Sequence, residues 1–280
     1  MENIKRKGLW MTRLLQMKIH ILAKSTVAAY FLILFQYAGS LYADEATDII
    51  NQSEIKTKSK TEQSTFRMEL LDKSGKVTQV RTLDIFYKKD GTTESTLQKF
   101  LSPRIMQGTG LLIEDKANEP SDIWYYLSST RRLRRISGAE KSNWYMGTEF
   151  TYEDFEDYQT NLYRFTLLKK AACNDSECYV IEATPATEDE KNSSGYSKKI
   201  FWIELKSLYP IQVEYFTKND HMSKKLTASD LTLRGNYWRP KTLTMQNLDN
   251  GNSTRMIETK RIIDAPLKNY YVSKRYLRKD

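Results

Sequence analysis

The sequence TFRMELLDKSGKVTQVRTLDIFYKKDGTTESTLQKFL, residues 65–101, decides the fold class. Apolar and polar residues alternate from Thr65 to Leu70, which is the pattern of a strand with one buried face. The pair Asp90-Gly91 follows a second run of β-type residues and predicts a tight hairpin turn before a third. The stretch therefore predicts consecutive antiparallel strands.

The same pattern continues toward the end of the chain. Runs rich in β-branched and aromatic residues recur about every ten residues between Gly, Asn, Asp or Pro turns, which predicts an antiparallel sheet that curls or closes. Acidic residues early and lysines late in residues 44–60 favour a short helix, and residues 270–277 fit either a strand or a helix. After residue 101 the expected strands are 108–114, 122–128, 131–136, 162–169, 178–183, 199–205, 211–217, 225–233, 237–247 and 254–263.

Residues 1–43 have the order of a secretory signal peptide. A basic region precedes the apolar run Val27–Phe35, and small residues follow it up to Ala43. This run is well short of the roughly 20 residues that a transmembrane helix needs. We expect passage through the inner membrane, cleavage near Ala43 and a periplasmic location. The alternative is an uncleaved N-terminal membrane anchor.

The net charge of +9 depends strongly on these first residues. Residues 1–43 hold six of the 44 basic residues and one of the 35 acidic ones, so the remainder carries about +4. Nucleic-acid binding usually needs a concentrated basic face, and we expect none here. The charge fits transient contact with anionic membrane surfaces. Residues 44–280 show no repeat and no linker, which predicts a single domain.

The cysteine and histidine counts argue against an enzyme. Cys173 and Cys178 flank four polar residues, as at a hairpin tip, and in an oxidising compartment they favour a disulfide over two free thiols. No second Cys or His pair completes a zinc site. His221 is the only histidine after residue 43, and general acid–base chemistry relies mostly on histidine. We expect no cofactor and no metal.

Residues 100–157 combine aromatic residues and methionine with a basic run and an acidic run. One interpretation is structural: the aromatic residues are ordinary core, and the arginines lie on a solvated strand. The other is a cavity mouth, in which residues 144–150 form an apolar lid with Gly138 and Gly147 as flexible points. In that case the arginines of residues 131–135 would contact phosphate or carboxylate head groups.

Two segments carry a resemblance to a known family. They are LSPRIMQGTGLL (residues 101–112) and IWYYLSSTRRLRRISGAEKSNWYMGTEFTYEDF (residues 123–155). The chain resembles the outer-membrane lipoprotein-sorting proteins of the LolA-like superfamily, in a branch associated with exporters, from about residue 61 to the end. The resemblance implies a half-open barrel made by a curved antiparallel sheet, with helices on its concave side and an apolar cavity. It also implies periplasmic transport of lipid or lipoprotein.

These arguments select the candidate site residues. Four arginines are expected to contact head groups or a partner: Arg131, Arg132, Arg134 and Arg135. The residues expected to line the apolar cavity and its lid are Phe66, Met68, Leu70, Leu111, Trp124, Tyr126, Leu133, Trp144, Tyr145, Met146 and Phe150.

Three functions compete at this point. The first is a carrier that binds an acyl chain or a lipoprotein for transfer toward the outer membrane. The second is an accessory of an inner-membrane exporter, or a lipid-sensing interaction module without carrier turnover. The third is an enzyme that would use carboxylates such as Glu149, Glu153 and Asp154, and we favour it least. Burial of an acyl chain supplies on the order of 10 kcal/mol before costs, which favours the carrier.

Overall fold

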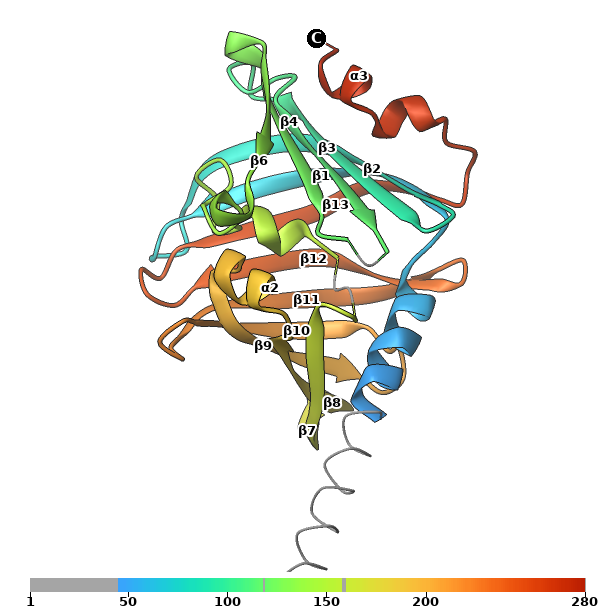
Figure 1. Cartoon of the computed structure of the whole chain (residues 1–280). Helices are drawn as coiled ribbons and strands as arrows, with labels where there is room; N and C mark the ends of the chain where they lie inside the picture. Colours follow the sequence, from blue (N-terminus) through green and yellow to red (C-terminus); the bar gives the residue numbers. More distant parts are fainter. Residues whose placement is uncertain (1–44, 118, 158–159, 280) are drawn as a thin grey trace, which may run out of the picture. The chain divides into compact units, whose positions relative to one another are not determined.

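The computed structural model describes residues 45–117, 119–157 and 160–279 (Figure 1). The expected signal segment, residues 1–43, lies outside this part. Residues Ala46–Asp280 cluster into one compact unit, and its architecture follows from a single large sheet.

The sheet contains 13 strands, and every pair of neighbours is antiparallel. Their order is β6-β5-β4-β3-β2-β1-β13-β12-β11-β10-β9-β8-β7, so β6 and β7 are the two edges and the sheet does not close. The bounds are β1 Thr61–Leu71, β2 Val77–Asp90, β3 Thr93–Ser102, β4 Gly110–Lys116, β5 Asp122–Leu127, β6 Arg132–Ile136, β7 Tyr163–Cys173, β8 Ser176–Pro185, β9 Tyr196–Glu204, β10 Pro210–Thr217, β11 Met222–Arg234, β12 Tyr237–Asn247 and β13 Ser253–Ile263.

The hairpin between β2 and β3 shows how local sequence sets the register. Asp90 pairs with Thr93, and Gly91 adopts a left-handed conformation with φ of +60° in the turn between them, where glycine has no steric penalty. The alternation read from residues 65–101 is therefore realised as three consecutive strands, β1 to β3.

Helices and helical turns are few and short. One helix covers residues 45–57, and the C-terminal segment, ambiguous by periodicity, is helical rather than extended. The other bounds are α2 Glu188–Ser193, α3 Lys274–Leu277, and the 3-10 turns η1 Ser128–Thr130, η2 Gly138–Glu140, η3 Tyr152–Phe155 and η4 Asn269–Val272.

Successive side chains of a strand point to opposite sides of the sheet. Each of the two faces carries an apolar cluster. In β5, Ile123 and Tyr125 belong to the larger core cluster, which also contains Ile49 and Ile50 of the helix over residues 45–57. The neighbouring Tyr126 belongs to a second cluster. The larger cluster fills the concave face, and the helix together with the segment 137–157 covers it (Figure 1).

The second cluster lies on the outer face of β2 to β5, under the C-terminal segment. Leu267, Val272 and Leu277 are buried there against Phe86 and three neighbouring strands. Gly110 permits this close approach, since a Cβ at that position would lie 2.9 Å from Leu277 Cδ1. The prediction of a mainly β protein with a curved antiparallel sheet, half open as a barrel, is confirmed, and helical segments cover both of its faces.

Candidate ligand cavity

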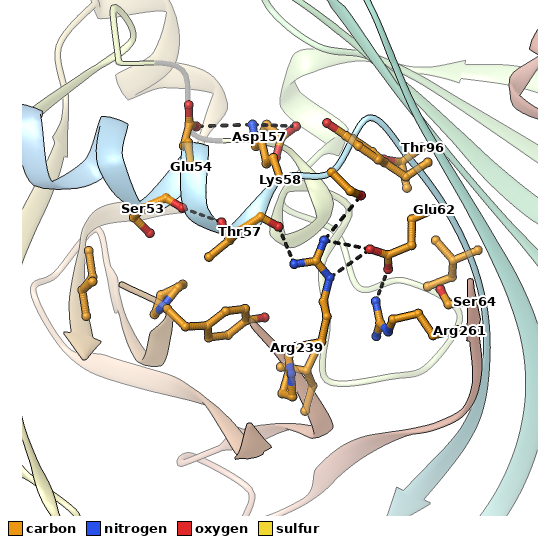
Figure 2. A pocket seen from close by; sticks show the side chains of 18 of the residues that line it. Ser53, Glu54, Thr57, Lys58, Glu62, Ser64, Thr96, Asp157, Arg239 and Arg261 are labelled. Atoms are coloured by element: carbon orange, nitrogen blue, oxygen red, sulfur yellow. Dashed lines mark hydrogen bonds and ion pairs between the residues drawn. The ribbon is translucent and has the colours of Figure 1, made fainter. Parts of the chain in front are cut away.

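A cavity of about 370 Å³ lies between the helix over residues 45–57 and the concave face of the sheet (Figure 2). This is at the small end of the range typical of ligand sites, about 300–1,000 Å³. Strands β2 and β9 both line it, although five other strands lie between them in the sheet order. The sheet therefore curls far enough to bring these two strands to one space.

The lining has an apolar floor and a polar end. The apolar side chains come from the helix, which forms the roof, and from β1, β2, β9, β10 and β12, which form the floor. They are Ile50, Phe66, Ile85, Phe201, Ile203, Pro210, Pro240 and Leu243. The polar lining residues are Ser53, Glu54, Thr57, Lys58, Ser59, Glu62, Ser64, Tyr87, Thr96, Asp157, Tyr209, Arg239 and Arg261.

Two buried arginines share one carboxylate at the polar end. Arg239 Nη2 lies 2.8 Å from Glu62 Oε2, and Arg261 pairs with the other Glu62 oxygen. Arg261 Nε also donates to Glu258 Oε2 at 2.6 Å. Buried charges are costly unless they are paired, and here two cations face two carboxylates. The floor can therefore stay apolar beside a charged cluster that is neutral as a whole.

Arg239 also holds the end of the helix. Its Nη1 donates to the carbonyl oxygen of Thr57 (Figure 2). Nη1 also donates to the Trp238 carbonyl oxygen, and Nη2 donates to Ser59 Oγ at 3.5 Å. Thr57 is the last residue of the helix, so this cation satisfies a carbonyl at the negative end of the helix dipole. Arg239 thereby connects the roof of the cavity to strand β12.

Lys58 forms a second attachment of the roof. Its Nζ lies 3.0 Å from Glu94 Oε2, 3.3 Å from Asp157 Oδ2 and 3.3 Å from Glu54 Oε1. Burial opposes the charged form, yet Asp157, Glu54 and Glu94 together raise the pKa of Lys58 above its ordinary value. The helix end is thus held to β3 and to the segment 137–157 at the same point.

An adjoining cavity of about 310 Å³ shares Glu54, Lys58 and Asp157 with the first one. Asp115 lies in its wall and accepts a hydrogen bond from Ser121. Burial, reinforced by the negative charge of Asp157, raises the pKa of Asp115 to about 8. Burial also raises the pKa of Asp157 to about 6, although Lys58 opposes this shift. Both carboxyl groups of this wall therefore hold their protons more tightly than a solvent-exposed carboxyl group does.

The segment 137–157 packs its aromatic residues into the concave face. Tyr145 is fully buried, stacks on Phe100 with 6.1 Å between ring centroids, and meets Phe155 edge-on at 5.2 Å. Arg81 Nη1 donates to the Met146 carbonyl at 2.9 Å, which joins the segment to β2. Gly147 has a φ of +70° and forms a tight turn there. Tyr145, Phe150 and Tyr152 of this segment therefore form part of the concave-face cluster.

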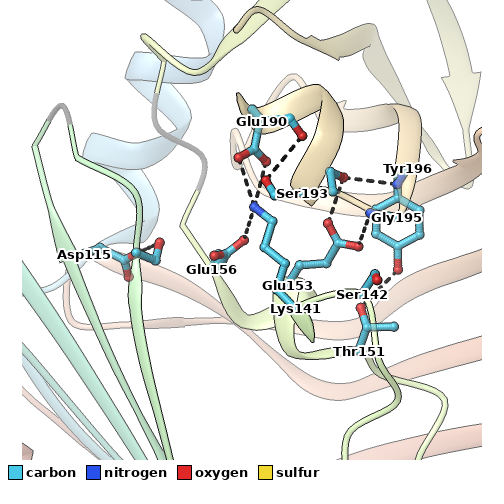
Figure 3. A network of polar contacts seen from close by, with 12 residues as sticks. Asp115, Lys141, Ser142, Thr151, Glu153, Glu156, Glu190, Ser193, Gly195 and Tyr196 are labelled. Carbon is cyan, nitrogen blue, oxygen red and sulfur yellow. Dashed lines mark hydrogen bonds and ion pairs between the residues drawn. The ribbon is translucent and has the colours of Figure 1, made fainter. Parts of the chain in front are cut away.

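A buried polar network joins this segment to α2 (Figure 3). Lys141 Nζ contacts Glu190 at 2.9 Å and Glu156 at 3.2 Å. Glu153 accepts hydrogen bonds from Ser194 Oγ at 2.8 Å and from the Gly195 N–H at 2.9 Å. These carboxylates are therefore occupied in holding the segment.

The other carboxylates considered for catalysis are also in structural contacts. Asp154 Oδ2 lies 2.6 Å from Lys224 Nζ, and Tyr196 donates to Asp154 Oδ1 at 2.8 Å. Glu149 accepts from Asn247 Nδ2 at 2.8 Å. In the described residues no group of three His, Cys, Asp or Glu side chains is arranged to hold a metal.

The structure brings together only part of the apolar set selected from the sequence. Phe66 lines the cavity, and the rest divide into three groups. Met68, Leu70, Leu111, Tyr145, Met146 and Phe150 belong to the concave-face cluster or pack against it. Trp124, Tyr126 and Leu133 lie in the outer cluster, away from the cavity. Trp144 is half exposed.

The four arginines lie at the β6 edge of the sheet and do not line the cavity. Arg131 follows η1 in a left-handed conformation, and Arg132 is exposed. Arg134 pairs with Glu140 at 2.7 Å, and Arg135 pairs with Asp122. At the opposite edge, Cys173 and Cys178 form a disulfide at the tip of the β7–β8 hairpin.

Sequence reasoning missed the polar residues of the cavity. Glu62 shares its face of β1 with Phe66 and Met68, so a charge in phase with core residues was an available signal. Arg261 gave no such signal, because a register shift opposite Thr65 and Phe66 changes the phase of β13. The attachment of the helix by Arg239 depends on residues about 180 positions apart and has no local signature.

A protein-family model and several solved structures match this chain. The matching family model, described as "-like: Uncharacterized protein", covers residues 92–279. No curated protein sequence matches significantly. None of the helices in the described residues has the length and apolar character needed to span a bilayer.

Solved structures show the same fold over most of the chain. A domain from Vibrio parahaemolyticus, named for outer membrane lipoprotein sorting, is 27% identical with a TM-score of 0.78 and covers 85% of this chain and 100% of its own. A protein of an uncharacterised domain family from Desulfovibrio piger is 24% identical, with a TM-score of 0.77 and coverages of 84% and 99%. A LolA superfamily protein from Nitrosomonas europaea is 17% identical, with a TM-score of 0.63 and coverages of 82% and 98%.

Proposed function

We propose that this chain, a member of the LolA-like superfamily, is a carrier in the periplasm that binds an acyl chain of a lipid or lipoprotein. The observation that carries the proposal is the cavity with the apolar floor under the helix over residues 45–57. Transfer of the cargo toward the outer membrane is part of the proposal, in keeping with the sorting role for which the Vibrio domain is named.

The size and chemistry of the cavity support an acyl ligand. Each methylene that moves from water to an apolar wall contributes about 0.8 kcal/mol. About ten methylenes would contribute on the order of 8 kcal/mol before the costs of association. The paired charges of Glu62, Arg239 and Arg261 at one end suit the polar group of a lipid better than its hydrocarbon end.

The segment 137–157 supports reversible loading. Its Tyr145 hydroxyl is buried and has no hydrogen-bond partner among the described residues, which costs about 1–3 kcal/mol. The closed packing is therefore less stable than its aromatic contacts alone would make it. In the proposal this segment moves aside as cargo enters and returns as cargo leaves, which a carrier requires.

Competition with a fluorescent fatty acid tests the site. Ile85 lines the cavity and is only partly buried, so Ile85→Trp should fill the space and weaken binding at least tenfold. Ile262→Trp is the matched control, because Ile262 is exposed on β13. Equal affinities for the two variants would place the ligand elsewhere.

Transfer between vesicles separates a carrier from a lipid sensor or an exporter accessory. The wild-type protein should speed the movement of a labelled lipid from donor to acceptor vesicles in proportion to its concentration. Ile85→Trp should lose this activity, and Ile262→Trp should retain it. Saturable binding without transfer would exclude the carrier and leave the sensing or accessory role.

A further inference from the structure

The C-terminal segment is both basic and aromatic. Residues 268–279, KNYYVSKRYLRK, contain five Lys or Arg residues, three tyrosines and no acid. The segment forms η4 and α3 and lies on the outer face of the sheet, away from the cavity. Its composition therefore has no part in the ligand site described above.

Packing fixes this segment in place. Val272 and Leu277 are buried in the outer cluster. Tyr271 stacks on Phe86 with ring centroids 5.3 Å apart, and Tyr276 meets the same ring edge-on at 5.5 Å. Lys99 Nζ donates to the Tyr276 carbonyl at 3.1 Å, which places a cation at the C-terminal end of α3. The segment is an ordered surface rather than a loose tail.

The cations of the segment point outward. Lys268, Arg275, Arg278 and Lys279 are exposed, and among the described residues none of the four forms an ion pair with an acidic side chain. Lys274 lies over the Trp124 ring at 3.6 Å from its centroid. The tyrosine rings are half-buried beside these charges, so polar tips and apolar ring edges occur together on one surface.

One further cation lies on the outer face at the β6 edge. Leu133 packs against the same outer cluster, and Arg135, two residues further along β6, lies on the same face and pairs with Asp122. At the other end of the segment, Asn269 contacts Asp90 at 3.4 Å and Lys88. Acidic residues also occur along this face: Glu114 lines the same hollow as Lys274 and Arg275, and Asp280 follows Lys279 in the sequence.

We propose that this surface, defined as residues 268–279, docks the protein on a bilayer that carries anionic phospholipids. Tyrosine rings and basic side chains favour the interface between head groups and hydrocarbon, and each Lys or Arg near an anionic surface strengthens binding about fivefold. Cationic groups on flexible side chains can adapt to a fluid layer of lipid head groups. An acidic protein is the alternative partner for this surface. The proposal adds a membrane partner to the proposed carrier and leaves the cargo site unchanged.

Co-sedimentation with vesicles tests the proposal. The native protein should bind phosphatidylglycerol vesicles, should bind phosphatidylcholine vesicles far more weakly, and should be released by salt. The triple variant Arg275→Gln, Arg278→Gln, Lys279→Gln should bind phosphatidylglycerol roughly 100-fold more weakly. The matched control is Arg164→Gln, Lys169→Gln, Lys170→Gln, which removes three exposed cations from the β7 edge and should change binding less than about twofold.

Three outcomes would overturn the proposal. They are absence of binding to phosphatidylglycerol, as expected for a surface that serves an acidic protein; equal losses in the two triple variants, as expected for net charge alone; and equal binding to both lipids, as expected for an apolar anchor. Both variants should still bind the fluorescent fatty acid like the wild-type protein. Loss of that binding in every form would refute the carrier and leave membrane docking to be decided by the vesicles.

Discussion

At the scale of single residues, the cavity depends on charged side chains that are buried on the concave side of the sheet. Glu62 lies between Arg239 and Arg261, and Lys58 lies among three carboxylates. Moving a charged side chain out of water has a large cost in solvation free energy. That cost is offset only when every charge of the cluster keeps its partner. Their arrangement holds the helix over residues 45–57 at one end and leaves its apolar face over the floor of the cavity.

The unsatisfied hydroxyl of Tyr145 gives the first prediction. Tyr145→Phe removes a buried hydroxyl for which the described part of the chain offers no hydrogen-bond partner, so we expect the free energy of unfolding to rise by about 1 kcal/mol in a denaturant titration. If the segment 137–157 must open for loading, the same change should weaken fatty-acid binding several-fold. Tyr179→Phe, at a residue only partly buried on β8, is the control. Tighter binding by Tyr145→Phe would contradict a loading role for this segment.

Asp115 predicts a pH dependence of stability. Its folded-state pKa is raised to about 8 by burial and by Asp157, above the ordinary value near 4. The folded protein therefore keeps a proton that the unfolded chain loses above about pH 4. The resulting stabilisation is present at low pH and is lost as the pH rises through about 8.

The substitution Asp115→Asn removes this titration. Relative to the wild-type protein, the variant should gain about 2–4 kcal/mol of unfolding free energy between pH 5 and pH 9, measured by urea titration at each pH. Glu114→Gln changes the neighbouring side chain on the opposite face of β4 and should show no such trend. Parallel curves for the wild-type protein and Asp115→Asn would refute the buried-acid interpretation.

At the scale of elements, the helix over residues 45–57 acts as a roof attached mainly at its C-terminal end. Arg239 reaches the Thr57 carbonyl, and Lys58 reaches Glu94 on β3. At the other end of the roof, Ala46, Ile49 and Ile50 contribute apolar contacts to the concave-face cluster. We therefore expect the helix to depend on the sheet for its stability, as short helices generally do.

Removal of the Arg239 attachment should loosen the roof selectively. Arg239→Met leaves the Thr57 carbonyl without this donor and Glu62 with only one arginine, which should cost about 2–4 kcal/mol. Hydrogen exchange should accelerate in residues 46–57 more than in β3. Arg255→Met, which removes a more exposed ion pair with Glu69, should cost less than about 1 kcal/mol. Uniform acceleration over the whole chain would contradict a local role for Arg239.

The elements were largely predictable from sequence, whereas the assignment of faces was not. Alternation and turn residues identified the strands, since both are local properties. Trp124, Tyr126 and Leu133 were expected in the cavity, but both faces of β5 are apolar because the C-terminal segment covers the outer one. Alternation cannot say which apolar face becomes concave. The concave face is determined by the curvature of the whole sheet and by contacts with segments more than 100 residues away in the sequence, such as that of Lys274 with Trp124.

At the scale of the whole molecule, the open sheet separates two surfaces with different chemistry. The concave face holds the cavity, its paired charges and the aromatic segment 137–157. The outer face carries the basic and aromatic C-terminal segment. A carrier needs this separation, because it must shield its cargo from water on one side and meet a membrane on the other.

Native mass spectrometry of the protein purified from its own cells tests the central claim most directly. The account predicts a second mass peak above that of the protein, which mild activation removes as a lipid or an acyl-bearing fragment, and which Ile85→Trp strongly depletes while Ile262→Trp leaves it intact. A single bare mass under gentle conditions, from cells in which the protein is active, would contradict an acyl-binding cavity.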